Sequence, residues 1–188
     1  MTLRGLLDQG YTGREVRYWL LSRHYRKPVF FSQSKLDSVK NTISHLDKFV
    51  HKLYFLKPAS EDSDIDQVIY DLRHKFVKSM DDDLNIAAAL ASLFQFTHHV
   101  NRIMDRNGLS TSDKEKVLKA LERINSVLDV MDLKPTKVDQ DVVALIDKRE
   151  QARRNKEWGT ADRLRQELMA RGVEVIDTKD GPVWHKAE

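Results

Sequence analysis

The sequence predicts a mainly α-helical protein: an antiparallel helical bundle followed by a small α+β module with two helices and a β-hairpin. Apolar residues recur at steps of three and four over several long segments, as on one face of an amphipathic helix. The chain of 188 residues has only seven Gly and four Pro, too few for the many turns of a β-sandwich. Near the C-terminus, a Val-Glu-Val-Ile run followed by Asp-Gly favours a short two-stranded ribbon.

The predicted bundle covers residues 1–134 and contains four or five long helices joined by short loops. After a helical turn over 2–8, the first runs from about 12 to 24 and ends before Lys27-Pro28, because proline disfavours helical geometry in the preceding residue. The carboxylates of Asp81–Asp83 suit a helix N-terminus, and Asn107-Gly108 suits a left-handed C-cap. Later apolar stripes run from Leu36 to Leu53, Ile65 to Met80, Ile86 to Met104 and Val117 to Leu128.

A smaller module is predicted over residues 139–188, after a linker at Lys134-Pro135-Thr136. Two helices, from about 139 to 155 and 160 to 171, are separated at Trp158-Gly159. Gly172 should stop the second helix, because glycine is the usual residue just after a helix. The ribbon then occupies the remaining residues up to Trp184, which is expected to pack within it.

Composition excludes several classes of site. The chain has no Cys, which rules out disulfides, thiolate zinc sites and a cysteine nucleophile. It has no glycine-rich phosphate loop, and its seven histidines show no spacing suited to a metal. No apolar run approaches the roughly 18 residues of a membrane span, so a cytoplasmic protein without a membrane partner is expected. We therefore predict no catalytic residue and no metal ligand in this chain.

The segment around Trp158 has the chemistry needed to bind unpaired RNA bases. It combines cationic side chains for phosphates, an aromatic ring for stacking and carboxylates for base edges. Tryptophan beside Gly159 at a helix junction can present its ring outward. The alternative is a solvated helix face held by ion pairs between residues four apart. The basic residues of this segment are Lys148, Arg149, Arg153, Arg154, Lys156, Arg163 and Arg165.

Three parts of the chain together resemble the cysteinyl-tRNA synthetases, which are class I aminoacyl-tRNA synthetases. The stretch from Gly10 to Pro28 resembles the opening of that family's helical anticodon-binding domain, and Phe76, Met80 and Asp81–Asn85 resemble its F-x-x-x-M-x-D-D-(F/L)-N segment. Members often continue with Thr-Pro, where this chain has Ile86-Ala87. The C-terminal pattern is matched by Leu145, Ile146, Arg149, Ala152, Arg153, Lys156, Trp158, Ala161, Asp162, Arg165, Leu168, Gly172, Asp177, Thr178, Gly181 and Trp184.

The resemblance implies a DALR-type anticodon-binding bundle and a C-terminal module that recognises the G-C-A anticodon of cysteine tRNA. It associates Arg153, Trp158, Asp162 and Asp177 with anticodon contacts. Either carboxylate could accept both N–H donors on the edge of guanine. As structural alternatives, Asp162 could pair within its own helix and Asp177 could open the hairpin turn. We expect phosphate contacts without sequence preference from Arg149, Arg154 and Lys156.

The family's catalytic motifs, H-I-G-H and K-M-S-K-S, are absent from this sequence, as are the ligands of its zinc site. The resemblance therefore implies ATP and zinc only for a catalytic domain outside this chain, which alone should not aminoacylate tRNA. Its expected partners are cysteine tRNA and that catalytic domain, with no role for DNA. Two alternatives remain open: a freestanding tRNA-binding protein and a helical scaffold for protein partners.

Overall fold

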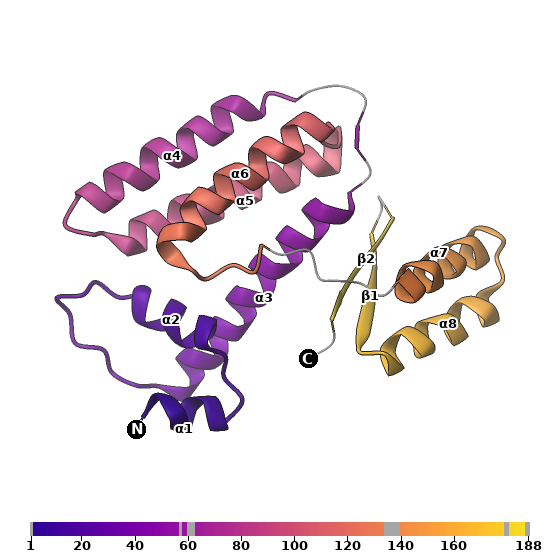
Figure 1. Cartoon of the computed structure of the whole chain (residues 1–188), viewed down its shortest axis with the longest axis horizontal. Helices are drawn as coiled ribbons and strands as arrows, with labels where there is room; N and C mark the ends of the chain where they lie inside the picture. Colours follow the sequence, from indigo (N-terminus) through magenta and orange to yellow (C-terminus); the bar gives the residue numbers. More distant parts are fainter. Residues whose placement is uncertain (1, 57, 60–62, 134–139, 179–180, 187–188) are drawn as a thin grey trace. The chain divides into compact units, whose positions relative to one another are not determined.

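Helices dominate the structure, a computed structural model that describes residues 2–56, 58–59, 63–133, 140–178 and 181–186 (Figure 1). The prediction of a mainly α-helical protein is confirmed. The chain divides into two units. Unit 1 comprises residues 1–50 and 56–133, and unit 2 comprises residues 51–55 and 134–188.

Unit 1 begins with α1 (Leu3–Asp8), α2 (Gly13–Leu21) and most of α3 (Gln33–Phe55), whose last five residues belong to unit 2. A capping box starts α2, because the Thr12 hydroxyl accepts from the Glu15 amide at 3.3 Å while the Glu15 carboxylate accepts from the Thr12 amide at 2.6 Å. The helix ends three residues earlier than predicted. Here the Ser22 hydroxyl donates to the carbonyl of Trp19 at 2.7 Å, a local bond that competes with helix continuation.

The rest of unit 1 consists of α4 (Ile65–Asp81), α5 (Ile86–Arg106) and α6 (Thr111–Leu128), with α4 packed against both α5 and α6. Gly108 adopts a left-handed φ of 74° after α5, as the Asn-Gly sequence predicted. The N-cap of α6 is Ser110, whose hydroxyl accepts from the amide of Asp113 at 3.0 Å. The buried side chains of these helices come from the predicted apolar stripes and include Leu72, Leu93, Val100, Val117 and Leu121.

The acidic run before α5 does not cap that helix, contrary to expectation. Asn85 is the N-cap, and its side-chain oxygen accepts from the amide of Ala88 at 3.2 Å. Asp83 lies instead at a left-handed φ of 49° and accepts hydrogen bonds from the Tyr25 hydroxyl at 2.6 Å and the Arg26 guanidinium at 2.9 Å. Asp83 therefore links the connection between α4 and α5 to the loop after α2.

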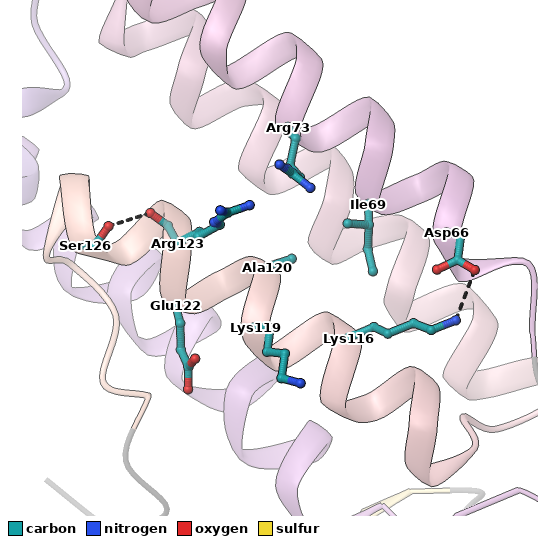
Figure 2. A pocket seen from close by; sticks show the side chains of 9 residues that line it. All are labelled: Asp66, Ile69, Arg73, Lys116, Lys119, Ala120, Glu122, Arg123 and Ser126. Atoms are coloured by element: carbon teal, nitrogen blue, oxygen red, sulfur yellow. Dashed lines mark hydrogen bonds and ion pairs between the residues drawn. The ribbon is translucent and has the colours of Figure 1, made fainter.

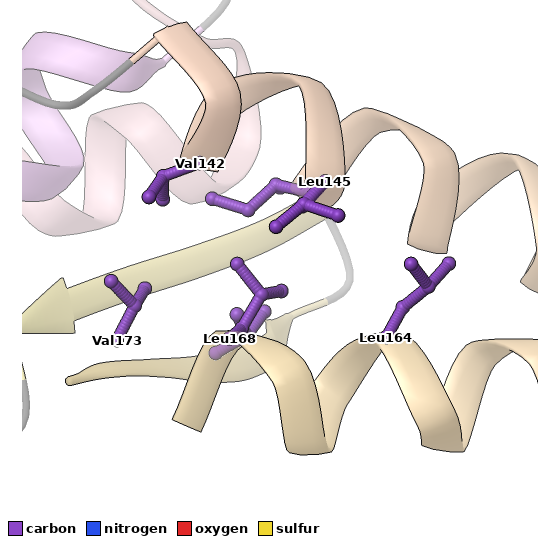
Figure 3. Packing of buried hydrophobic residues seen from close by; sticks show 7 residues of the cluster. Val142, Leu145, Leu164, Leu168 and Val173 are labelled. Atoms are coloured by element: carbon purple, nitrogen blue, oxygen red, sulfur yellow. The ribbon is translucent and has the colours of Figure 1, made fainter. Parts of the chain in front are cut away.

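Unit 2 contains α7 (Gln140–Arg154), α8 (Trp158–Ala170) and the strands β1 (Val173–Thr178) and β2 (Gly181–Lys186). Gly172 follows α8 with a left-handed φ of 71°. The strands pair antiparallel, with Val173 opposite Lys186 and Thr178 opposite Gly181, and the residues that join them lie outside the described part of the chain. A small core holds α7, α8 and β1 together (Figure 3); it consists of Val142, Leu145, Ile146, Leu164, Leu168, Val173 and Val175.

Candidate nucleic-acid interface

The turn between α7 and α8 has a fixed backbone geometry. The amide of Glu157 donates to the carbonyl of Ala152 at 2.8 Å, and the amide of Lys156 donates to that of Arg153 at 3.0 Å. These two bonds form a Schellman motif, in which the residue just after the helix adopts a left-handed conformation. That residue is Lys156, with a φ of 61°, where glycine would be unstrained. The turn therefore holds the cationic side chain of Lys156 at a backbone conformation that is strained for any residue with a Cβ atom.

The ring of Trp158 lies at the surface, at the first position of α8. Its side chain is 59% exposed, as expected for a stacking residue at this junction. Asp162 is also exposed and lies one turn further along, so both side chains share one face of the helix. Neither forms a hydrogen bond, ion pair or ring contact with another residue that the structure describes. The pair within α8 that was the alternative for Asp162 is therefore not formed within the described residues.

The remaining predicted RNA contacts have different environments. Arg154 and Lys156 are exposed at the end of α7 and in the turn, close in sequence to Trp158. Arg153 is half-buried. The backbone of Asp177 lies in β1 opposite Pro182, and its side chain lies outside the described part of the structure.

Arg149 differs from the expectation of a phosphate contact. Only 3% of its surface is exposed, and its guanidinium lies 3.7 Å from the carboxylate of Glu150. Its position in α7 explains this burial, because it lies three and four residues after Ile146 and Leu145 and three before Ala152, on the stripe that faces the core. Because Arg149 is buried, a phosphate in solution cannot reach its side chain in this structure.

A groove between α7 and α8 combines two cations of the predicted basic segment with neutral polar groups that the sequence reasoning did not include. Its volume is about 520 Å³. The side chains along it include a cation from each helix, Lys148 and Arg163, and neutral hydrogen-bonding groups from Gln151, Asn155 and Thr160. Thr160 and Arg163 are three residues apart in α8, as are Lys148 and Gln151 in α7. Residues with this spacing lie on one helix face, so the sequence alone could have indicated the polar face that each helix contributes to the groove.

The structure offers no metal centre among the residues it describes: no three His, Asp or Glu side chains there lie close enough to hold an ion. Within the same residues, none of the helices is long and apolar enough to cross a membrane. The α7–α8 turn of unit 2 carries an exposed ring, an exposed carboxylate and several cations.

Two known protein families match this chain. Residues 75–133 match the DALR domain, and residues 136–184 match the cysteinyl-tRNA ligase anticodon binding domain. The chain carries both domains. The resemblance predicted from the sequence is thereby confirmed, and the anticodon binding domain includes the α7–α8 turn with Trp158 and Asp162.

Cysteine–tRNA ligases are also similar to this chain over part of their length. The chain is 38% identical to the cysteine–tRNA ligase of Chlamydia felis and 39% identical to that of Chlamydia abortus, in each case over 96% of this chain and 39% of the relative. Identity to the ligase of Protochlamydia amoebophila is 34%, over 96% of this chain and 38% of the relative. This chain thus spans about two fifths of the length of the curated relatives that it matches.

Proposed function

We propose that this chain binds cysteine tRNA and recognises its G-C-A anticodon, as the anticodon-binding part of a cysteine–tRNA ligase. The observation that carries the proposal is the exposed ring of Trp158 on the same face of α8 as Asp162, within a domain of the anticodon-binding family. A base unstacked from the anticodon loop would stack on Trp158, an interaction that contributes roughly 1–3 kcal/mol per base.

Base selectivity in this proposal comes from carboxylates. The first anticodon base, guanine, presents two adjacent N–H donors, and a carboxylate can accept both in one plane. Asp162 is exposed and suits this role, with Asp177 as the second candidate. An adenine or pyrimidine would leave the carboxylate partly unpaired, which penalises the wrong tRNA.

Cations around the turn would bind the sugar-phosphate backbone. Arg154 and Lys156 are exposed and lie within four residues of Trp158 in the sequence, and the half-buried Arg153 would contact a base edge or a phosphate. Such contacts position the RNA and increase affinity without selecting a sequence. Under the proposal, ATP use, zinc binding and cysteine transfer belong to the catalytic domain of a full ligase, and this chain uses no cofactor.

Binding measurements with two tRNAs test the proposal. At fixed near-physiological salt, the chain should bind cysteine tRNA more tightly than the same tRNA with its first anticodon base changed. Trp158→Ala should weaken binding about 5- to 150-fold, which corresponds to the stacking energy of roughly 1–3 kcal/mol. Phe30→Ala is the matched control, since Phe30 is an aromatic side chain with 76% exposure in the loop after α2.

Carboxylate variants identify the base-reading residue. Asp162→Asn and Asp177→Asn keep the side-chain shape but place an N–H₂ where an acceptor oxygen stood. The variant at the reading position should bind both tRNAs with nearly equal affinity. Equal affinity of the unmodified chain for both tRNAs would refute anticodon recognition by this chain.

A further inference from the structure

A second polar groove lies in unit 1, between α4 and α6 (Figure 2). Its volume is about 620 Å³. Ile69 from α4 and Ala120 from α6 provide apolar surface in the groove. The charged side chains that line it are Arg73, Lys116, Lys119 and Arg123 with positive charge, and Asp66 and Glu122 with negative charge.

The charges in this groove are not balanced. Lys116 is neutralised, because its ammonium lies 3.0 Å from the carboxylate of Asp66 and 3.5 Å from that of Asp113. The side chains of Arg73, Lys119 and Arg123 form no ion pair or hydrogen bond with any residue that the structure describes. Glu122 is the one carboxylate of the groove lining without such a partner in the described residues. Three cations therefore remain available to a ligand against one carboxylate.

The two arginines approach from opposite helices. Figure 2 shows Arg73 extending from α4 and Arg123 extending from α6 into the space between the helices, while Glu122 points away from both. A guanidinium presents N–H donors in a planar fork that fits the oxygens of a phosphate. Two such groups on either side of one groove can bind a single phosphate from both sides.

We propose that the α4–α6 groove binds a phosphate of the RNA backbone, as a contact separate from the anticodon module. The inference rests on the proposed RNA-binding function and adds a second contact region to it. A nucleic-acid backbone carries a negative charge at every nucleotide, so it suits a groove whose unpaired cations outnumber its unpaired carboxylates among the described residues. The contact would increase affinity for any RNA helix and leave base discrimination to unit 2.

A double variant tests the groove directly. Arg73→Gln with Arg123→Gln removes both guanidinium groups from exposed positions, where loss of a side chain should leave the fold intact. The matched control is Arg102→Gln with Arg106→Gln, which removes the same charge from exposed positions of α5 outside the groove. Circular dichroism checks that both variants keep their helices.

The first probe is a short RNA duplex without loops, titrated over a range of salt concentrations. The groove variant should bind about tenfold more weakly than the unmodified chain, and the slope of log affinity against log salt should fall by about 1 for each lost phosphate contact. The α5 control should keep most of the affinity and the slope. Equal losses in the two variants, or no loss in the groove variant, would overturn the proposal, as would absence of duplex binding at low salt.

The second probe separates this inference from anticodon recognition. With cysteine tRNA and its anticodon-altered form, the groove variant should lose affinity for both by the same factor, so that their ratio is unchanged. Groove-dependent duplex binding without any anticodon preference would support the phosphate site and contradict the proposed function. Anticodon preference without groove-dependent binding would do the opposite.

Discussion

Replacing Lys156 with glycine should stabilise the α7–α8 turn while weakening RNA binding. Lys156 has a φ of 61°, and a left-handed conformation costs an L-residue about 1–2 kcal/mol. Glycine avoids that cost but loses about 0.5–1 kcal/mol more through backbone freedom on folding. The difference leaves a net stabilisation of about 0.5–1 kcal/mol for Lys156→Gly.

Amide hydrogen exchange measures this stabilisation at the turn itself. The Glu157 amide donates to the Ala152 carbonyl and is released when the turn opens. After correction for the intrinsic rate of the new sequence, its exchange in Lys156→Gly should slow about two- to fivefold, as the net free energy requires. Lys156→Ala is the matched control, because it removes the charge but keeps the Cβ atom and therefore the strain.

RNA affinity should respond to charge and not to turn stability. Both variants lose the Lys156 ammonium, so both should bind cysteine tRNA more weakly by a similar factor. The reasoning is wrong if Lys156→Ala slows Glu157 exchange as much as Lys156→Gly does, or if only one of them binds RNA less well. The expected pattern would show that lysine is retained at this position for binding at the expense of stability.

Three further predictions concern stability. Leu168→Ala opens a cavity at a fully buried position of the unit 2 core, so chemical denaturation should show a loss of about 2–5 kcal/mol, with amide exchange in α4–α6 unchanged. Burial alone would raise the pKa of Asp113, but hydrogen bonds from the amide and hydroxyl of Ser63, with the charge of Lys116, outweigh it and hold the pKa of Asp113 below its usual range. Its contribution is therefore complete above about pH 4 and lost as pH falls through the lower folded-state pKa, so urea denaturation of Asp113→Asn should show a smaller decline in stability on acidification. Asn125→Ala removes three hydrogen bonds to the backbone after α6, and thermal unfolding should report a loss of about 1–3 kcal/mol, whereas a neutral result would mean that water replaces those bonds.

The helices were predictable because each one buries a continuous apolar stripe. The ends were less predictable, because side chains compete for backbone groups there: Ser22 ends α2 early, and Asn85 caps α5 in place of the acidic run. The burial of Arg149 was visible in principle, since the residue lies on the apolar stripe of α7, but alternating charges around it suggested a solvated face.

The candidate site shows the same limit. Trp158 and its flanking cations are close in sequence, so their proximity could be predicted from one segment. The α4–α6 groove combines Arg73 with Lys119 and Arg123 from a distant helix. Spacing along α6 indicates that Lys119 and Arg123 are neighbours, but only the packing of α4 against α6 brings Arg73 to the same groove.

The solvent-exposed indole of Trp158 also gives unit 2 a built-in optical reporter. Trp19, by contrast, is partly buried against the cluster of Leu6, Tyr11, Val16 and Leu36 in unit 1. Indole emission shifts to longer wavelength in water, so Trp158 should emit at a longer wavelength than Trp19. Trp158 should also be more accessible to a soluble quencher such as iodide. In a Trp184→Phe variant, which removes the third indole of the chain, a titration followed by fluorescence would then report events at the α7–α8 turn without any attached dye.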